Sequence, residues 1–257
     1  MFLENPNQLG YIPKKIISLV PSLTELLHDL DLEEETIGIT KFCFHPKEWY
    51  RSKERIGGTK TINIKKIIAL QPDLIIANKE ENIKEQIEEL AKTIPVWLTD
   101  VNSLDDALKM ITDIGSLTNR KAKAKEITSQ IKKTLPDQSQ SKKVKQKVIY
   151  LIWRNPYMGA GGDTFINDMI SRAGFDNLLK NKKRYPTFNL EEFENKKCDF
   201  IFLSSEPYPF KEKHILEINK LLPNTKVILV DGEYFSWYGS RLLKSAAYFK
   251  KLREESN

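Results

Sequence analysis

The sequence predicts an α/β protein of two Rossmann-like lobes with parallel sheets, joined by a single long helix. Apolar strands alternate with helices along the chain, which is typical of parallel sheets. One block of sequence also occurs twice without gaps, at residues 62–76 and 188–202. A helix with one apolar stripe separates the two halves. The expected parts are an N-terminal lobe (1–118), a connecting helix (119–136) and a C-terminal lobe (137–257).

The first lobe opens with an apolar strand over 16–20. Ser22 and Glu25 then form the Ser-x-x-Glu pattern of a capping box, so we expect a helix from Ser22 to about Leu30. Asn63 stands where the N-cap of the repeated helix belongs. The other expected elements of this lobe are a strand at 36–40, an aromatic loop at 42–46, a strand at 74–76, a helix at 82–93, a strand at 96–100 and a helix that begins after Ser103.

The connecting helix is predicted over residues 120–135. Ala124, Ile127, Ile131 and Leu135 recur at spacings of three and four, which gives one apolar stripe on an otherwise charged surface. Pro136 ends the pattern. A helix of this length is a rod of about 24 Å, stiff enough to tie two lobes together.

The second lobe repeats the plan of the first. Asn189 occupies the N-cap position that corresponds to Asn63. The expected elements are a strand at 148–151, a loop at 153–164, a helix at 164–173, a second loop at 182–186, the repeated helix and strand at 190–202, a strand at 227–231, a loop at 232–239 and a helix at 241–252.

Composition excludes several classes of protein. The 257 residues are 30% charged with a net charge of +6, and no apolar run approaches the ~20 residues that cross a bilayer. The densest basic run, Lys142–Lys147, lacks the interleaved aromatic residues of a nucleic-acid site. We expect no nucleic-acid partner, no membrane insertion and a monomer. Cys43 and Cys198 lie in different repeats, which favours two reduced thiols.

The N-terminus lacks the apolar segment of a signal peptide, since it reads Met-Phe-Leu-Glu-Asn-Pro. The expected location is therefore the cytoplasm for the chain as written, and the periplasm if a leader has been removed.

The order of elements resembles the helical-backbone class (class III) of ABC-transporter solute-binding proteins, which take up cobalamin, haem and ferric siderophores. The residues that carry this resemblance are 17–25, Gly57-Gly58-Thr59, 67–75, 161–178 and 231–241. The resemblance implies that the protein holds a bulky metal complex in a cleft between the lobes, with little hinge motion and without a cofactor of its own.

The resemblance also implies docking on an ABC permease through one acidic residue per lobe. Glu191 stands at the second-lobe position, whereas its repeat partner in the first lobe is Lys65. The Trp that a cobalamin-binding relative carries near Thr59-Lys60 is missing here. An anionic ferric siderophore is thus preferred to cobalamin as the ligand. The alternative is a cytoplasmic α/β enzyme or sensor of corrinoid or haem that reuses the fold.

Aromatic and cationic side chains gather in the predicted loops. Flat rings stack on macrocycles or catecholates, and guanidinium groups bind anionic complexes through paired hydrogen bonds. Core packing of the aromatics and ordinary solvated charge are the competing interpretations. The candidate ligand-binding residues are Phe42, Phe44, His45, Lys60, Trp153, Arg154, Tyr157, Arg184, Tyr185, Tyr234, Phe235, Trp237 and Arg241, with Lys41 and Tyr238 beside them.

Other chemistries are weaker interpretations. Cys43 and His45 could ligate a metal, but a structural zinc site needs four ligands, so we expect no metal site. The run Gly159–Thr164 before a helix could bind phosphate, or it could simply form a turn. No catalytic motif is present, and Ser22 and Ser204 have no His nearby in sequence. We therefore expect a binding protein and no catalytic residues.

Overall fold

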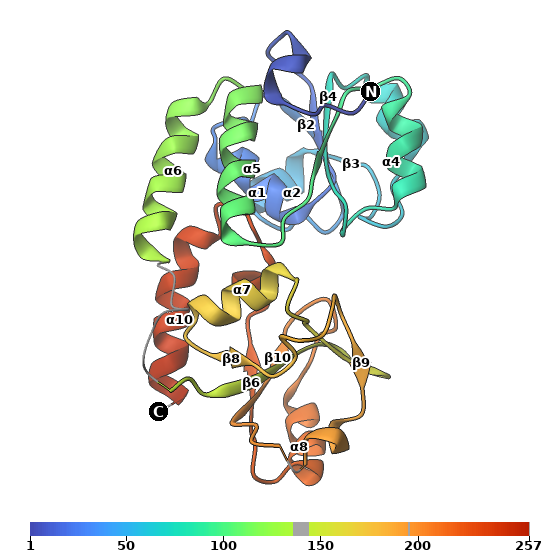
Figure 1. The fold of residues 1–257 in the computed structure, drawn as a ribbon. Coiled ribbons are helices and arrows are strands. Elements are labelled where there is room, and N and C mark those ends of the chain that lie inside the picture. Colours follow the sequence, from blue (N-terminus) through green and yellow to red (C-terminus); the bar gives the residue numbers. More distant parts are fainter. Residues whose placement is uncertain (136–143, 195, 257) are drawn as a thin grey trace. The chain divides into compact units, whose positions relative to one another are not determined.

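A computed structural model describes residues 1–135, 144–194 and 196–256. The chain divides into two compact units, coloured along the chain in Figure 1. The first unit comprises Met1–Val101, Asp105–Ile131 and Tyr238–Leu243, and the second comprises Asn102–Leu104, Lys132–Trp237 and Lys244–Asn257. The connecting helix thus belongs mostly to the first unit. Pro136, the boundary at residues 136 and 137, and Lys142 and Lys143 lie outside the described residues.

The first unit contains a five-stranded sheet with strand order β3-β2-β1-β4-β5, in which all pairs are parallel. The strands are β1 (Ile16–Ser18), β2 (Thr36–Ile39), β3 (Glu54–Arg55), β4 (Leu74–Asn78) and β5 (Val96–Thr99). The helices are η1 (Pro6–Leu9), α1 (Pro21–Asp29), α2 (Lys47–Ser52), α3 (Ile64–Leu70), α4 (Lys84–Ala91), α5 (Leu104–Leu117) and α6 (Lys121–Thr134).

The second unit contains a sheet with strand order β11-β10-β6-β7-β9, and β8 pairs with β6. Its strands are β6 (Lys147–Trp153), β7 (Tyr157–Gly159), β8 (Asp176–Asn177), β9 (Thr187–Phe188), β10 (Phe200–Ser204) and β11 (Lys226–Val230). Its helices are α7 (Phe165–Arg172), η2 (Leu190–Phe193), α8 (Glu212–Leu221), α9 (Glu233–Ser236) and α10 (Leu242–Ser256), of which the first two residues of α10 belong to the first unit.

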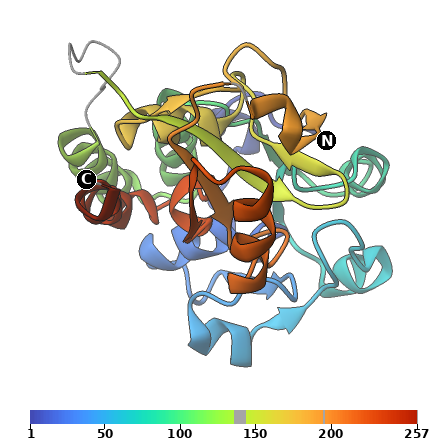
Figure 2. The same cartoon turned by 90° about the horizontal axis from the view of Figure 1, so that it is seen from below.

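The predicted α/β class is confirmed, with one correction to the second sheet. This sheet is mixed, because β7 runs antiparallel to both β6 and β9. Asn155, with φ of +60°, lies in the turn that reverses the chain after β6. Figure 2 shows β6 in yellow-green running into the yellow β7. Residues 153–164 were predicted as one loop, but they contain β7, the second strand of this hairpin.

The repeated Asp residues make equivalent hydrogen bonds in both units, whereas a side-chain cap by the repeated Asn is formed in the first. Asn63 Oδ1 accepts a hydrogen bond from the N–H of Lys66 at 3.0 Å, which caps α3 as predicted. Asp73 accepts from the N–H groups of Lys14 and Lys15 at 2.8 and 2.9 Å, just before β1. Asp199 accepts from the N–H of Lys147 at 2.7 Å, at the start of β6. Asp73 therefore fastens the start of β1 to the start of β4. In the same way, Asp199 fastens the start of β6 to the start of β10.

The predicted capping box at Ser22 and Glu25 is wrong. Helix α1 begins one residue earlier, with Pro21 at its first position and Val20 as an N-cap that makes no side-chain hydrogen bond. Glu25 instead pairs with Arg241, 216 residues away in sequence. The Ser-x-x-Glu pattern reflects only a local preference for capping a helix. Here the Glu25 carboxylate forms an ion pair with a residue distant in sequence instead.

Close helix packing in the first unit depends on Gly115. Helices α5 and α6 run side by side (Figure 1), and a Cβ on Gly115 would lie 2.3 Å from the Cβ of Ala124. Gly115 therefore lies inside α5 and lets the two helices approach. Asn119, with φ of +56°, follows the end of α5.

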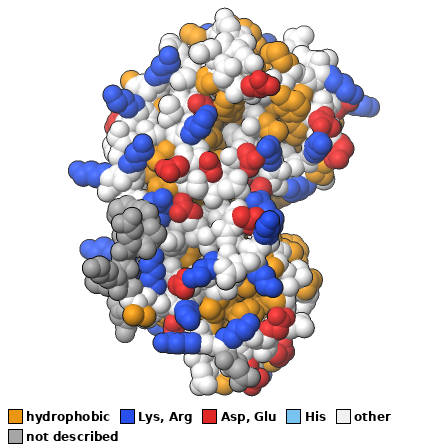
Figure 3. Space-filling view, in the orientation of Figure 1, with side chains coloured by type: hydrophobic (Ala, Val, Ile, Leu, Met, Phe, Trp, Pro, Cys, Tyr) orange, Lys and Arg blue, Asp and Glu red, His pale blue; other side chains and the backbone are white. Residues whose placement is uncertain are grey.

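Charge is mixed on the surface. Figure 3 shows Lys and Arg side chains dispersed among Asp and Glu on the face drawn, instead of gathered in one basic area. Among the residues that the structure describes, no helix is both long and apolar enough to span a bilayer.

Candidate functional site

In the first unit, the loop after β2 presents aromatic side chains to solvent. Phe42 and Phe44 are 43% and 51% exposed, whereas Cys43 between them is fully buried. The Cys43 Sγ lies 3.1 Å from the hydroxyl oxygens of both Thr24 and Thr40. This buried anchor turns the two neighbouring rings outward. Burial raises the pKa of the Cys43 thiol, so the group stays protonated and is a poor metal ligand.

The loop after β3 lies against this aromatic loop. A Cβ on Gly58 would lie 3.1 Å from the Phe42 ring and 3.2 Å from the Lys41 side chain. The Lys41 ammonium lies 5.1 Å from the centre of the Phe42 ring. Lys60 is exposed and donates a hydrogen bond to the backbone carbonyl of Glu80. His45 is half-buried at the end of the same aromatic loop. The first unit thus brings together the predicted residues Phe42, Phe44, His45 and Lys60.

In the second unit, three predicted residues gather at the end of β6. Trp153 is 41% exposed, and its ring meets Tyr208 edge-on with 5.7 Å between ring centres. Arg154 lies 2.6 Å from Glu217 in an ion pair. Hydrogen bonds from Arg154 to Tyr208 and Tyr157 raise the pKa of the guanidinium. Tyr208 therefore contacts Trp153 and interacts with Arg154, although it is absent from the residues predicted from the sequence.

The Arg184–Tyr185 loop closes over the glycine-rich run. The Arg184 guanidinium lies 5.6 Å from the centre of the Tyr185 ring and donates to Asn102 Oδ1 at 3.0 Å. The N–H groups of residues 159–162 donate to the backbone carbonyls of Pro186, Tyr150, Arg184 and Lys182 respectively. Because all four donors are used within the fold, the run forms a turn and not a cradle for phosphate.

The predicted aromatics around α9 have different environments. Phe235 is fully buried against the rings of Tyr150, Phe202 and Phe249, so it packs the core of the second unit instead of a binding surface. Tyr234 is half-buried and stacks on Tyr248, with ring centres 4.4 Å apart. Tyr238 and Arg241 are buried in the first unit.

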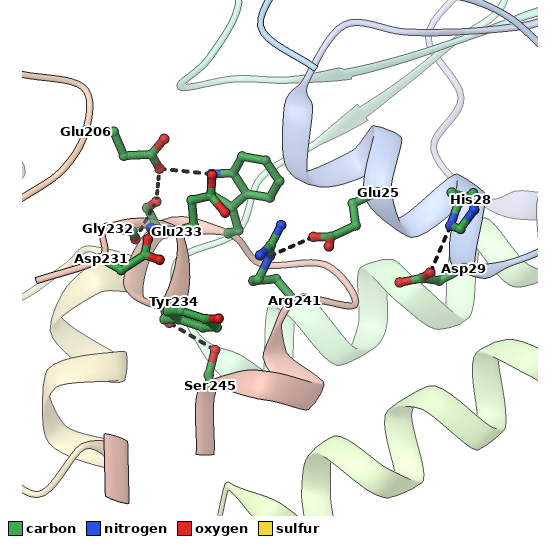
Figure 4. A network of polar contacts seen from close by, with 12 residues as sticks. Glu25, His28, Asp29, Glu206, Asp231, Gly232, Glu233, Tyr234, Arg241 and Ser245 are labelled. Carbon is green, nitrogen blue, oxygen red and sulfur yellow. Dashed lines mark hydrogen bonds and ion pairs between the residues drawn. The ribbon is translucent and has the colours of Figure 1, made fainter. Parts of the chain in front are cut away.

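Trp237 is held by a carboxylate that the sequence analysis missed. Figure 4 labels this carboxylate, Glu206, and draws its hydrogen bonds as dashed lines. The Glu206 Oε1 accepts from Trp237 Nε1 at 2.9 Å and from Ser236 Oγ at 2.7 Å. Burial, followed by the charges of Glu233 and Asp231, raises the pKa of Glu206. This carboxylate joins the loop after β10 to the loop after β11.

Arg241 forms a buried ion pair within the first unit. Its Nε lies 2.9 Å from Glu25 Oε2, and both side chains are 8% exposed. The pairing, visible in Figure 4, compensates the guanidinium charge. Arg154 and Arg241, two of the five predicted cations, are thus matched by carboxylates inside the fold.

The residues that the sequence analysis missed share one loop. Glu206, Tyr208 and Phe210 follow β10, and His214 lies in the first turn of α8. The Pro-rich run Glu206-Pro207-Tyr208-Pro209-Phe210 comes directly after an apolar strand, which is the same signal that identified the loops after β6 and β11. Ser204, the last residue of β10, accepts a hydrogen bond from Tyr150 Oη and donates one to the Glu206 carbonyl. No cluster of three His, Cys, Asp or Glu suited to a metal ion occurs within residues 1–135, 144–194 and 196–256.

Residues 16–223 match the protein family described as periplasmic binding protein. The chain belongs to the periplasmic binding protein family. The resemblance predicted from the sequence is thereby confirmed, and the chain is a solute-binding protein of this family.

Two curated relatives are similar over much of the chain. An uncharacterized ABC transporter substrate-binding lipoprotein, YvrC of Bacillus subtilis (strain 168), is 29% identical over 170 residues, which cover 62% of this chain and 53% of that protein. The match thus spans about half the length of this relative. A vitamin B12-binding protein of Pectobacterium carotovorum subsp. carotovorum (strain PC1) is 23% identical, over 91% of this chain and 86% of its own.

The fold is also that of a solved binding protein. The periplasmic haem-binding protein RhuT from Roseiflexus sp. RS-1, in apo form, superposes with a TM-score of 0.81 at 18% sequence identity, covering 95% of this chain and 99% of that one. At this level of identity the likeness shows a shared fold, and the ligand has to be argued from this chain's own residues.

Proposed function

We propose that this solute-binding protein holds a metal complex, namely a ferric siderophore, cobalamin or haem, for uptake through an ABC permease. The binding is non-covalent and involves no chemical step. The observation that supports the proposal most is Trp153, a large flat side chain left 41% exposed at the end of a sheet strand. In α/β sheets, ligands bind outside the carboxyl ends of the strands.

The aromatic loop of the first unit adds to this support. Phe42 and Phe44 are exposed, and Lys41 and Lys60 place ammonium groups in the same loops. Flat rings contribute stacking at low cost in side-chain entropy, and cations attract an anionic complex. Two of the proteins named above are described as binding vitamin B12 and haem, both of which are metal complexes with a large flat ring.

The ligand class is tested by titration. Purified protein is mixed in turn with hydroxocobalamin, haemin and a panel of ferric siderophores while tryptophan fluorescence and visible absorbance are followed. We expect saturable quenching by one of them with a Kd of about 1 µM or tighter. Trp153→Ala should weaken that binding by about tenfold or more. Leu216→Ala, which alters a 65% exposed residue of the same unit, is the matched control.

A chain that responds to none of these complexes would overturn the proposed ligand class. Quenching that persists unchanged in Trp153→Ala would leave the ligand class standing and remove Trp153 from the site.

We further propose that Glu191 contacts the permease. Glu191 is exposed in the first turn of η2, the second-unit copy of the repeated helix. Its counterpart Lys65 is exposed at the start of α3. An arginine on a permease would attract the first of these residues and repel the second. The location that this role requires is outside the inner membrane, which agrees with relatives described as periplasmic or lipoprotein.

A further inference from the structure

The loop after β10 carries Tyr208, and the groups around its hydroxyl determine whether that hydroxyl donates or accepts a hydrogen bond. Tyr208 is half-buried, and its ring contacts those of Trp153, Phe210 and His214, with ring centres 4.7–5.7 Å away. We infer that the Tyr208 hydroxyl donates a hydrogen bond to an anionic oxygen of the bound metal complex. This inference rests on the proposed function and adds the chemistry by which the site selects its ligand.

The protonation state of His214 decides which atom donates in its contact with Tyr208. Its Nδ1 accepts a hydrogen bond from the backbone N–H of Lys211 at 2.8 Å. A nitrogen that accepts a hydrogen bond carries no proton, so the imidazole is neutral with its proton on Nε2. Burial and the nearby Arg154 charge also lower the pKa of His214, in agreement with the neutral form. The Nε2 proton therefore faces Tyr208 Oη, 3.3 Å away.

Because His214 Nε2 carries the proton, the Tyr208 oxygen is the acceptor of that contact. The Tyr208 proton is therefore not used by His214. It can bind another partner, and this partner has to be an acceptor.

The Tyr208 ring lies beside the exposed ring of Trp153. Strands β6 and β10 are hydrogen-bonded neighbours, so Trp153 and Tyr208 follow the ends of adjacent parallel strands. The exposed indole offers a flat surface, and the hydroxyl beside it offers a hydrogen-bond donor. An acceptor that carries negative charge makes the stronger hydrogen bond here. The favoured ligand therefore has a flat face with a carboxylate, hydroxamate or catecholate oxygen at its edge.

A pair of ligands tests this selection, because haemin carries two carboxylates at the edge of its ring, whereas the edge of the corrin ring of hydroxocobalamin carries neutral amides. Tyr208→Phe removes the donor and leaves the ring. We expect it to weaken the binding of haemin, or of an anionic ferric siderophore if that is the complex bound, by about tenfold or more, since a hydrogen bond to a charged group contributes about 1.5–3 kcal/mol. Any binding of hydroxocobalamin should change about twofold or less.

Two further variants make the test specific. Tyr11→Phe removes a tyrosine hydroxyl that donates to the Asp73 carbonyl in the first unit, and it should leave every affinity unchanged. His214→Leu should weaken anionic-complex binding in the wild-type background and have no further effect in the Tyr208→Phe background, because it acts through that hydroxyl. Thermal melting checks that each variant is folded.

The outcomes separate this inference from the proposed function. A wild-type chain that binds no complex refutes the proposed function itself. A wild-type chain that binds only hydroxocobalamin, or a Tyr208→Phe variant that loses both ligands equally or neither, overturns the inference and leaves the function standing. A phenolate-to-iron absorption band that vanishes in Tyr208→Phe would also overturn it, because the oxygen would then be a metal ligand.

Discussion

At the scale of single residues, buried carboxylates organise the loops of this protein. Glu206 holds Trp237 and Ser236 in the second unit, and Glu25 holds Arg241 in the first. The two differ in how their charge is compensated. Glu206 receives hydrogen bonds from neutral donors and lies near Glu233 and Asp231, whereas Glu25 faces a guanidinium. They should therefore respond differently to substitution and to pH.

Glu206→Gln should change how stability depends on pH. The pKa of Glu206 is raised in the folded protein, so its contribution to stability is fully present below its ordinary value of 4.5 and is lost as pH rises through the folded value. Gln keeps an oxygen that accepts from Trp237 and Ser236 but does not titrate. We expect the variant to gain stability relative to wild type as pH rises above 4.5.

Urea unfolding from about pH 4 to about pH 8 measures this difference. Glu4→Gln, an exposed carboxyl in the first unit, is the control. A difference between Glu206→Gln and wild type that is constant with pH would show that Glu206 titrates alike in folded and unfolded chains.

Removing one partner of the Glu25–Arg241 pair should destabilise the first unit. Arg241→Met leaves the Glu25 carboxylate buried without its guanidinium, and the free energy of unfolding should fall by about 3–5 kcal/mol. The double variant Glu25→Leu/Arg241→Met should recover most of this loss. Lys79→Met breaks an exposed ion pair with Asp100 in the same unit and should cost about 1 kcal/mol or less. Equal losses in the single and double variants would argue that packing, not charge, dominates.

At the scale of elements, two glycines set the path of the loop after β3, which lies against the aromatic loop. Gly57 follows β3 with φ of +103°, a conformation that side chains rarely adopt. A Cβ there would lie 2.4 Å from the Thr61 carbonyl oxygen and 3.0 Å from the Asn63 nitrogen. Since Asn63 caps α3, strain at Gly57 acts on both the loop and the helix start.

Gly57→Ala should therefore lower the free energy of unfolding by about 1–3 kcal/mol. The adjacent Gly58→Ala is a matched control, because its Cβ would meet the ends of the Thr61, Phe42 and Lys41 side chains at 3.0–3.2 Å, and these can move. Thermal and urea unfolding compare the two. A larger loss for Gly58→Ala than for Gly57→Ala would contradict the argument from backbone strain.

At the scale of the whole molecule, the sequence repeat places side chains of opposite charge, Glu191 and Lys65, at corresponding positions of the two units. Glu191→Arg should reduce ligand uptake by about tenfold or more in cells that carry the cognate permease, while the affinity for ligand stays unchanged. Glu194→Arg, an exposed neighbour beyond η2, is the control. Lys65→Glu should leave uptake equal or raise it. Unchanged uptake in Glu191→Arg would refute docking through this residue.

The extent to which the sequence predicts this protein depends on the range of each interaction. Strand and helix positions follow from nearby apolar periodicity, and the Asn63 cap was found because it acts within three residues. The repeated Asp73 and Asp199 were visible as a pattern, although their work at the starts of β1 and β6 was not. The site was predicted loop by loop, so exposed residues such as Trp153 were selected together with the core residue Phe235.

The sequence by itself therefore determined the α/β class, the repeated plan and the family, because these depend on local pattern and its recurrence. The tertiary structure decided which side chains meet. Glu206 and Trp237 are 31 residues apart, and Glu25 and Arg241 are 216 apart. Such pairs form where the order of the strands brings segments that are distant in sequence close together. Local sequence preferences do not predict that order. The same reason places Tyr208 in contact with Trp153 and His214, where its hydroxyl acquires a role that its own neighbours in sequence do not indicate.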